Sequence, residues 1–190
     1  KIASFAFENC QKLKCIEFTN DSELQTIEDN AISSSIEKIK LPPCFVEFKQ
    51  CWCYRASKLV NIEFTSFNPN FTWTSDGFLL GKSDSKLSKF DILIFSKRNI
   101  ERAMIPSNIK QISPYCFYKC KNLRIIEFSN DSELQIIGKS AFYETQIEII
   151  KIPQHVSIIS SSAFDSCKKL KTIEFHNNSE LQKIGDYSFY

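Results

Sequence analysis

Apolar residues recur along the chain in the pattern Leu/Ile-x-x-Ile-x-Phe/Leu, with polar residues between most of them. The last two apolar residues of each copy are two positions apart, which places both on one side of a short strand. Each copy is therefore predicted to be a strand whose final apolar residues point inward. The seven copies are Leu13–Phe18, Ile36–Leu41, Leu59–Phe64, Ile100–Ile105, Leu123–Phe128, Ile147–Ile152 and Leu170–Phe175.

These copies begin 23, 23, 41, 23, 24 and 23 residues apart, so that a period of 23 is broken by one long gap. Strands that recur once per turn stack as a parallel sheet, because no single turn can bury its own apolar side. We predict a right-handed solenoid of about seven turns of 23 residues, mainly β within the α/β class, with one parallel sheet. Its core is expected to contain Phe18, Phe64, Phe128 and Phe175.

A second pattern, Leu/Val-x-x-Ile-x-x-x-Ala-Phe-x-x-Cys, lies between the strand segments. It is clearest from Ile109 to Cys120 and from Val156 to Cys167. Its small Ala and large Phe are expected to fill the interior from the opposite wall. Because the pattern begins and ends in mid-turn, we expect residues 1–190 to form one uncapped solenoid segment of a longer array.

The long gap corresponds to an insertion over residues 65–99 within this solenoid. Its two apolar runs, Phe78–Leu80 and Asp91–Phe95, flank a polar loop and predict a β-hairpin. Phe71 and Trp73 are expected to anchor the hairpin to the edge of the solenoid. Two interpretations stay open, a surface decoration and a specific binding lobe, since long loops tend to carry function.

The combined pattern Ile-x-x-x-Ala-Phe-x-x-Cys-x-x-Leu-x-x-Ile-x-Phe resembles the BspA-like leucine-rich repeats of bacterial and protist surface proteins. The resemblance covers nearly the whole chain except the insertion. It implies a cell-surface or secreted protein for adhesion or recognition, with a protein or glycoprotein ligand bound on the concave sheet face. A cytoplasmic interaction scaffold built on the same repeats is the alternative, because a fold alone does not determine function.

Net charge and hydropathy narrow the classes of partner. The formal net charge is +2, which gives no field strong enough to predict binding to nucleic acid. No apolar run approaches the roughly 20 residues that cross a bilayer, so no membrane insertion is predicted within this chain.

Eight cysteines raise the question of disulfides or metal, and their spacing argues against both. Cys10, Cys120 and Cys167 occupy one repeat position and are predicted to be buried; the last two, two turns apart, would lie about 10 Å from each other, beyond disulfide reach. The Cys51-Trp52-Cys53 spacing does not suit zinc. The chain has only four glycines and no recognisable catalytic motif. We predict no enzyme, with no catalytic, cofactor-binding or metal-binding residues.

Two outward-facing rows follow from the strand pattern. One row is mostly charged and alternates in sign, which alone predicts a solvated ladder: Glu17, Lys40, Glu63, Met104, Glu127, Lys151 and Glu174. The adjoining row contains Ile125 and Ile149, an exposed apolar pair that folding does not require. With Arg102 and Met104 nearby, these isoleucines form the predicted partner-binding patch.

Four Asn-x-Ser/Thr sequons add a possible modification, N-glycosylation at Asn20, Asn70, Asn130 and Asn177. Three of them fall in the same repeat position, which duplication of a repeat also explains. In a secreted protein, these loops would carry a row of glycans along one edge.

Overall fold

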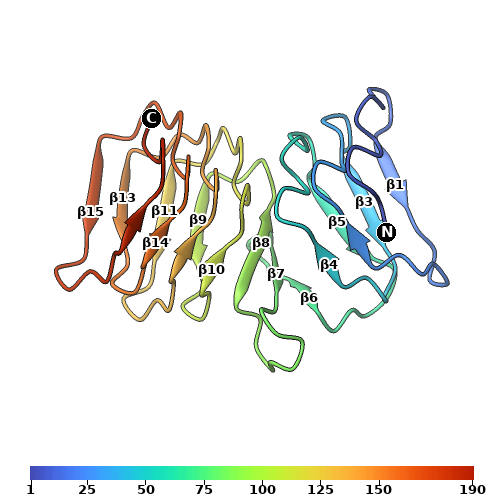
Figure 1. Ribbon diagram of the computed structural model, residues 1–190, viewed down its shortest axis with the longest axis horizontal. Coiled ribbons are helices and arrows are strands. Elements are labelled where there is room, and N and C mark those ends of the chain that lie inside the picture. The colour runs from blue at the N-terminus through green and yellow to red at the C-terminus, as the bar shows by residue number, and fades with distance from the viewer. The chain divides into compact units, whose positions relative to one another are not determined.

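The computed structural model describes all residues from 1 to 190 as strands and loops, without a helix (Figure 1). The mainly β prediction is confirmed, and nothing in the chain contributes an α component. There is accordingly no helix long and apolar enough to cross a membrane. The chain divides into two compact units, Lys1–Asn70 (unit 1) and Phe71–Tyr190 (unit 2).

All seven predicted segments form strands, one per turn, which we call the face strands. In unit 1 these are β1 (Cys15–Glu17), β3 (Lys38–Leu41) and β5 (Asn61–Phe64); in unit 2 they are β9 (Arg102–Ile105), β11 (Ile125–Phe128), β13 (Ile149–Ile152) and β15 (Thr172–Phe175). Where they pair, they pair parallel and in repeat register, for example Ile16 with Ile39 and Ile150 with Ile173. The stacked solenoid predicted from the period is confirmed.

The face strands do not form one continuous sheet. Unit 1 has the ladder β1-β3-β5, whereas unit 2 has two separate pairs, β9 with β11 and β13 with β15. The expectation of a single parallel sheet is therefore wrong in unit 2, where β11 and β13 lie side by side without ladder pairing. The turn between these two strands also differs in length, as described below with the site.

A second set of parallel strands, here called the wall strands, lines the opposite side of each turn. Each is only two residues long: β2 (Thr26–Ile27) and β4 (Glu47–Phe48) in unit 1, and β10 (Gln111–Ile112), β12 (Ile136–Ile137), β14 (Ile158–Ile159) and β16 (Lys183–Ile184) in unit 2. In unit 2 they continue into a seven-stranded sheet of order β16-β14-β12-β10-β8-β7-β6. The wall sheet thus stays continuous past the point where the face strands separate.

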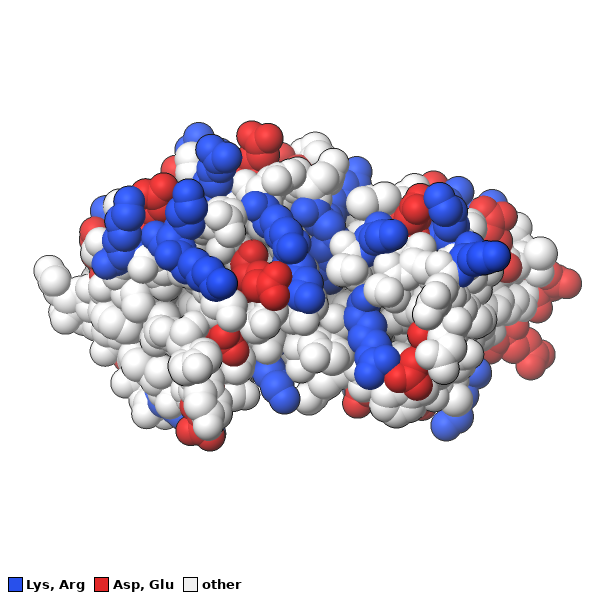
Figure 2. Space-filling view, turned by 90° about the horizontal axis from the view of Figure 1, so that it is seen from above, with Lys and Arg blue, Asp and Glu red and all other residues white.

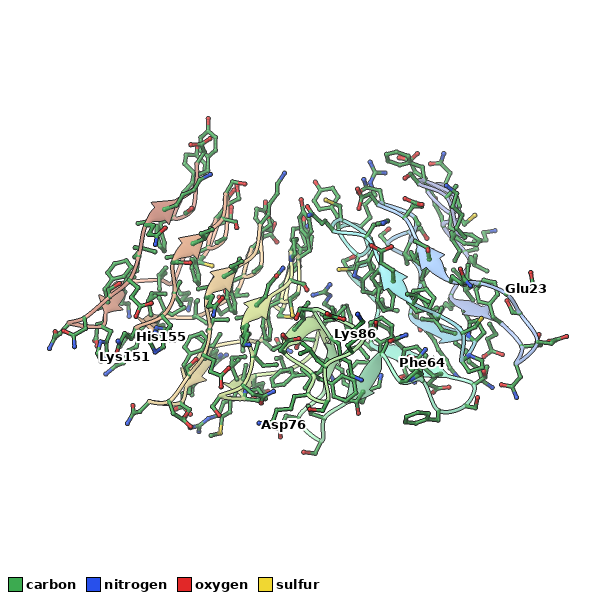
Figure 3. All side chains as sticks on the ribbon, turned by 60° about the horizontal axis from the view of Figure 1, so that its bottom comes forward. Glu23, Phe64, Asp76, Lys86, Lys151 and His155 are labelled. Carbon is green, nitrogen blue, oxygen red and sulfur yellow. The ribbon has the colours of Figure 1, made fainter.

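The predicted hairpin exists and belongs to the core of unit 2. It consists of β7 (Phe78–Gly81) and β8 (Ile92–Ser96), preceded by β6 (Phe71–Trp73), and all three strands pair antiparallel. Because β8 also pairs parallel with β10, and Phe78, Leu79, Leu93 and Phe95 are fully buried, the interpretation as a surface decoration is wrong. Only its loops protrude, including those that hold Asp76 and Lys86 (Figure 3).

Stacked aromatic rings fill the interior of unit 2, as the Ala-Phe pattern predicted. Phe117, Phe142 and Phe164 are buried and stack in that order, and the exposed ring of Phe189 continues the stack, with ring centroids 4.9, 5.1 and 5.3 Å apart. The small Ala-slot residues beside them, such as Ala141, are fully buried. Large and small side chains therefore alternate to close each layer.

The inward Phe residues of the face strands are less buried than predicted. Phe18, Phe64 and Phe128 are half-buried, and Phe175 is 41% exposed. Phe175 lies on β15, which pairs on one side only, so no further turn covers its ring. The expectation for Phe175 is wrong for this reason.

Of the three cysteines in one repeat position, Cys120 and Cys167 are buried, as predicted, and Cys10 is only half-buried. Cys10 belongs to the first turn of the chain, where a neighbouring turn covers one side alone. The Cys167 thiol donates to the Phe142 carbonyl at 3.0 Å, and it lies 3.2 Å from the Thr145 hydroxyl.

Candidate functional site

The four residues of the predicted patch are all exposed on the face strands of unit 2. Ile125 is 45% exposed, Ile149 is 51% exposed and Met104 is 60% exposed, and Arg102 is exposed beside them. On the β9–β11 pair, Ile125 lies directly opposite Arg102. Their neighbours in sequence, such as Ile150, point inward and are fully buried. The alternation that the strand pattern predicted is therefore present in unit 2.

Arg102 is already occupied by an ion pair. Its Nη2 lies 2.7 Å from both carboxylate oxygens of Glu127, one strand away. Lys151 and Glu174 lie directly opposite each other on β13 and β15 and form an ion pair at 3.2 Å. Only this second pair joins two members of the predicted charged row, because Arg102 comes from the adjoining row and Met104 is the residue opposite Glu127. Both ion pairs are worth little individually because they are solvated. Arg102 and Met104 lie on β9, beside the strand that contains Ile125. The guanidinium of Arg102 is already paired with Glu127.

A one-residue change in turn length separates the strands that carry the two isoleucines. The turn from Leu123 to Ile147 has 24 residues, whereas the corresponding turn from Leu13 to Ile36 has 23. The additional residue lies between Ala141 and Ile147. In the 23-residue turn, β1 and β3 pair over three residues; in the 24-residue turn, β11 and β13 do not pair. The ladder is therefore absent at the turn that contains the extra residue.

The separation of β11 and β13 leaves a groove of about 520 Å³ on the exposed face. Ile125 and Ile149 form its apolar walls, and the buried Ile126 lies at its base. We call this the β11–β13 groove, and its lining is Arg124, Ile125, Ile126, Glu127, Phe128, Glu148, Ile149 and Lys151. The structure thus brings Ile125 and Ile149 together and leaves Arg102 and Met104 outside the lining.

Sequence reasoning missed the residues that complete the groove, above all Arg124 and Glu148. The signal was present as the single 24-residue interval among intervals of 23. The interval alone could not show that β11 and β13 would fail to pair, because a loop could also have accommodated the extra residue as a bulge.

Positive charge gathers at the end of the groove where β11 and β13 begin. Lys171 Nζ lies 2.9 Å from Glu148 Oε2. The hydrogen bond and charge of Lys171, with the nearby charges of Lys169 and Arg124, hold the pKa of Glu148 below its usual value. Lys171 is thus paired with Glu148, and neither Arg124 nor Lys169 has an ion-pair partner of its own within salt-bridge distance.

A smaller hollow of about 330 Å³ continues from the groove past the ends of the same strands. It shares Phe128 and Lys151 with the groove, and it is bordered by Asn130 and Asn177. Figure 3 labels Lys151 on β13 and His155 in the loop after that strand, where His155 Nδ1 lies 2.9 Å from Glu180. The recessed surface of unit 2 therefore runs from a basic end to the loops that contain two of the sequons.

The sequon asparagines occupy two kinds of environment. Asn20, Asn130 and Asn177 are exposed in the loops that follow face strands β1, β11 and β15. Asn70 is half-buried immediately before β6, and its backbone N–H donates to Asn68 Oδ1 at 2.8 Å. The first three are open to an attached glycan, and their glycosylation stays a prediction.

The face strands of unit 1 are paired throughout. There Lys38 lies between Glu17 and Glu63, at 3.6 and 3.0 Å, across an intact three-stranded ladder. Its hydrogen bond holds the pKa of Glu63 below the usual value. Glu17 and Glu63 belong to the predicted charged row, but they pair with Lys38 of the adjoining row and not with Lys40 of their own row. The charged rows of unit 1 match a solvated ladder.

The β11–β13 groove combines apolar walls with a charged rim. Its carboxylates, Glu127 and Glu148, are both held in ion pairs with neighbouring cations. No group of three or more His, Cys, Asp or Glu side chains is placed to hold a metal ion. Apolar walls with a charged rim are the usual composition of a protein-binding surface.

Comparison with known proteins identified one family and several similar structures. The chain matches the family described as BspA type leucine rich repeat region, in six copies over residues 1–80 and 84–190. No curated protein matches the chain by sequence.

Three solved structures share the fold. A leucine-rich repeat protein from Eubacterium ventriosum is 20% identical over 96% of this chain and 59% of that one, with a TM-score of 0.68. The pneumococcal vaccine antigen PcpA is 23% identical over 92% and 48%, with a TM-score of 0.69. A leucine rich cell surface protein from Faecalibacterium prausnitzii is 16% identical over 95% and 65%, with a TM-score of 0.55. The chain thus spans about half to two thirds of the length of each.

Proposed function

The chain belongs to the BspA type leucine-rich repeat family, and on this basis we propose that it is a non-catalytic recognition module of a cell-surface or secreted protein. It binds a protein or glycoprotein partner through the exposed face of unit 2, at the patch formed by Arg102, Met104, Ile125 and Ile149. Leucine-rich repeats generally present extended surfaces to other proteins and carry no chemistry of their own.

The observation that carries this proposal is the exposed isoleucine pair in the β11–β13 groove. A solvated ladder needs no apolar side chains, and Ile125 and Ile149 line a recess of about 520 Å³. Recessed apolar residues ringed by charges are where binding energy concentrates in protein interfaces. The role in adhesion is supported by the similar proteins, one of which is described as a cell surface protein and another as a vaccine antigen.

The test is binding of the purified chain to an immobilised panel of extracellular glycoproteins, each with and without its glycans. We expect saturable binding to at least one of them. The double variant Ile125→Ser/Ile149→Ser should bind at least about tenfold more weakly, which corresponds to about 1.4 kcal/mol. Its free energy of unfolding should change by less than about 1 kcal/mol, because both side chains already face solvent.

A matched control is Val46→Ser/Val60→Ser, which removes two exposed apolar side chains from unit 1. This variant should bind as the unchanged chain does. Equal binding by the isoleucine variant, or a loss of binding by the valine variant alone, would show that the patch is misplaced.

A further inference from the structure

The β11–β13 groove combines three features that together define the chemistry of an occupant. The first is its apolar lining. Ile125 and Ile149 are about half exposed, and Ile126 and Phe128 lie beside them. An aliphatic side chain of a partner would remove these surfaces from water, at about 25 cal/mol per Å² buried.

The second feature is the backbone on the two facing edges. The Ile152 carbonyl accepts from His176 N–H and the Glu148 carbonyl accepts from Thr172 N–H, so these groups point toward β15. Because successive residues of a strand direct their backbone groups to opposite sides, those of Ile149 and Lys151 point toward β11. β11 and β13 form no ladder there, although Cα atoms of the two strands come within 8 Å of each other. An extended strand inserted between them would need about 9.6 Å, two strand spacings, so a partner main chain can reach these groups only from the exposed side of the groove.

The third feature is the surplus of positive charge at the end where both strands begin. Lys171 is paired with Glu148, and Arg124 and Lys169 lie near the same carboxylate. Glu101 lies beside Arg124 on the neighbouring turn, so Arg124, Lys169 and Lys171 exceed the two nearby carboxylates, Glu101 and Glu148, by one positive charge. Figure 2 shows Lys and Arg side chains gathered on the face turned toward the viewer.

We propose that the β11–β13 groove binds an extended acidic polypeptide segment, with an aliphatic side chain against Ile125 and Ile149 and a carboxylate near Arg124 and Lys169. The inference rests on the proposed function and specifies the partner's chemistry. A carboxylate supplies the charge that the rim lacks, and guanidinium is well suited to bind it. The isoleucine walls favour a peptide over an anionic glycan, whose hydroxyls would find no polar partners against them.

The test uses a defined probe, the blocked peptide acetyl-Asp-Ile-Asp-Leu-Asp-amide, added to the chain labelled at its isoleucine δ1 methyl groups. We expect saturable methyl shifts at Ile125, Ile126 and Ile149, with a Kd on the order of 1 mM for so short a ligand. The same peptide with Lys in place of Asp should cause no saturable shift. Binding should weaken as salt is added, because exposed charges contribute to it.

Charge-reversal variants distinguish binding at Arg124 and Lys169 from nonspecific attraction of the acidic peptide to other cations of the chain. The variant Arg124→Glu/Lys169→Glu should bind the acidic peptide at least about tenfold more weakly. Lys12→Glu/Lys14→Glu is the matched control, because these residues occupy the same repeat positions in unit 1. It should change the affinity less than about twofold.

Four outcomes would overturn the inference. One is the absence of isoleucine shifts with the acidic peptide, and another is equal binding of the lysine peptide. The third is a heparin-derived octasaccharide that binds at Arg124 and Lys169 while the acidic peptide does not, which would identify an anionic-glycan site. Binding to the glycoprotein panel that depends on Ile125 and Ile149 but not on Arg124 and Lys169 would overturn this inference and leave the proposed function standing.

Discussion

At the residue scale, exposed and buried isoleucines alternate within single strands of unit 2. Ile125 and Ile149 face solvent, whereas Ile126 and Ile150 are buried one position later. The side chains are chemically identical, so the difference comes only from the period of two in a strand. For that reason the exposed pair could be predicted from the sequence. Arg124 could not, since its place depends on how far apart β11 and β13 lie.

The buried thiols make a second prediction at this scale. Burial raises the pKa of Cys120 and Cys167 above the ordinary value for a thiol. As the pH rises through the ordinary thiol pKa, near 8.5, the unfolded chain loses these protons before the folded chain does. The folded state is then increasingly disfavoured, so stability is greatest below that pH and falls above it. Cys120→Ala/Cys167→Ala should therefore lose less stability between pH 8 and pH 10.

Thermal unfolding across this pH range measures the effect. The double variant should have a lower Tm at pH 7, because each substitution leaves a cavity, but its Tm should decline less steeply toward pH 10. Cys44→Ala removes an exposed thiol and serves as the control. Parallel declines in the double variant and the unchanged chain would contradict the assignment of these thiols to the core.

At the scale of elements, the positions of the face strands could be predicted from the sequence, but the pairing between them could not. Each face strand repeats a long apolar signature, so both its position and its inward side follow from sequence. The wall strands are two residues long, and most of them end at the Ile of the second sequence pattern, as at Ile112 and Ile159. That pattern located the opposite wall, but it did not predict that these residues pair as strands. The hairpin strands β7 and β8 were predicted as well. Their place in the wall sheet was not, because pairing of β8 with β10 depends on contacts distant in sequence.

The missing ladder between β11 and β13 predicts an alternating pattern of amide exchange in β13. Amides of Ile150 and Ile152 point toward β15 and should be protected. Those of Ile149 and Lys151 point toward β11 and should exchange at least about tenfold faster, since local opening is not required to expose them. Residue-resolved hydrogen exchange by NMR measures all four.

Strand β3 is the internal control for that experiment, because it pairs with β1 on one side and β5 on the other. Its amides should show uniform protection from Ile39 to Leu41. Uniform protection along β13 as well would mean that β11 and β13 are paired in solution and that the groove is closed.

At the scale of the whole molecule, one repeat pattern gives two kinds of surface. Unit 1 presents an intact charged ladder around Lys38, and unit 2 presents a recess where one turn is a residue longer. A solenoid built from near-identical turns can acquire a binding site in this way without a change of fold, because each turn contacts only its neighbours. The family and the stacked architecture were predictable from the period. The site required the structure, because the 24-residue interval does not by itself show that the ladder is absent there.

The most direct test of the recognition site is hydrogen exchange of the chain with and without a bound partner from the glycoprotein panel. We predict that the partner slows exchange chiefly in residues 123–128 and 147–152, the two strands that border the β11–β13 groove, together with the basic segment at 168–171. Residues of unit 1 should exchange at the same rate in both states. Protection confined to the hairpin loop at 82–91, or to the face strands of unit 1, would contradict the account and place recognition elsewhere on the solenoid.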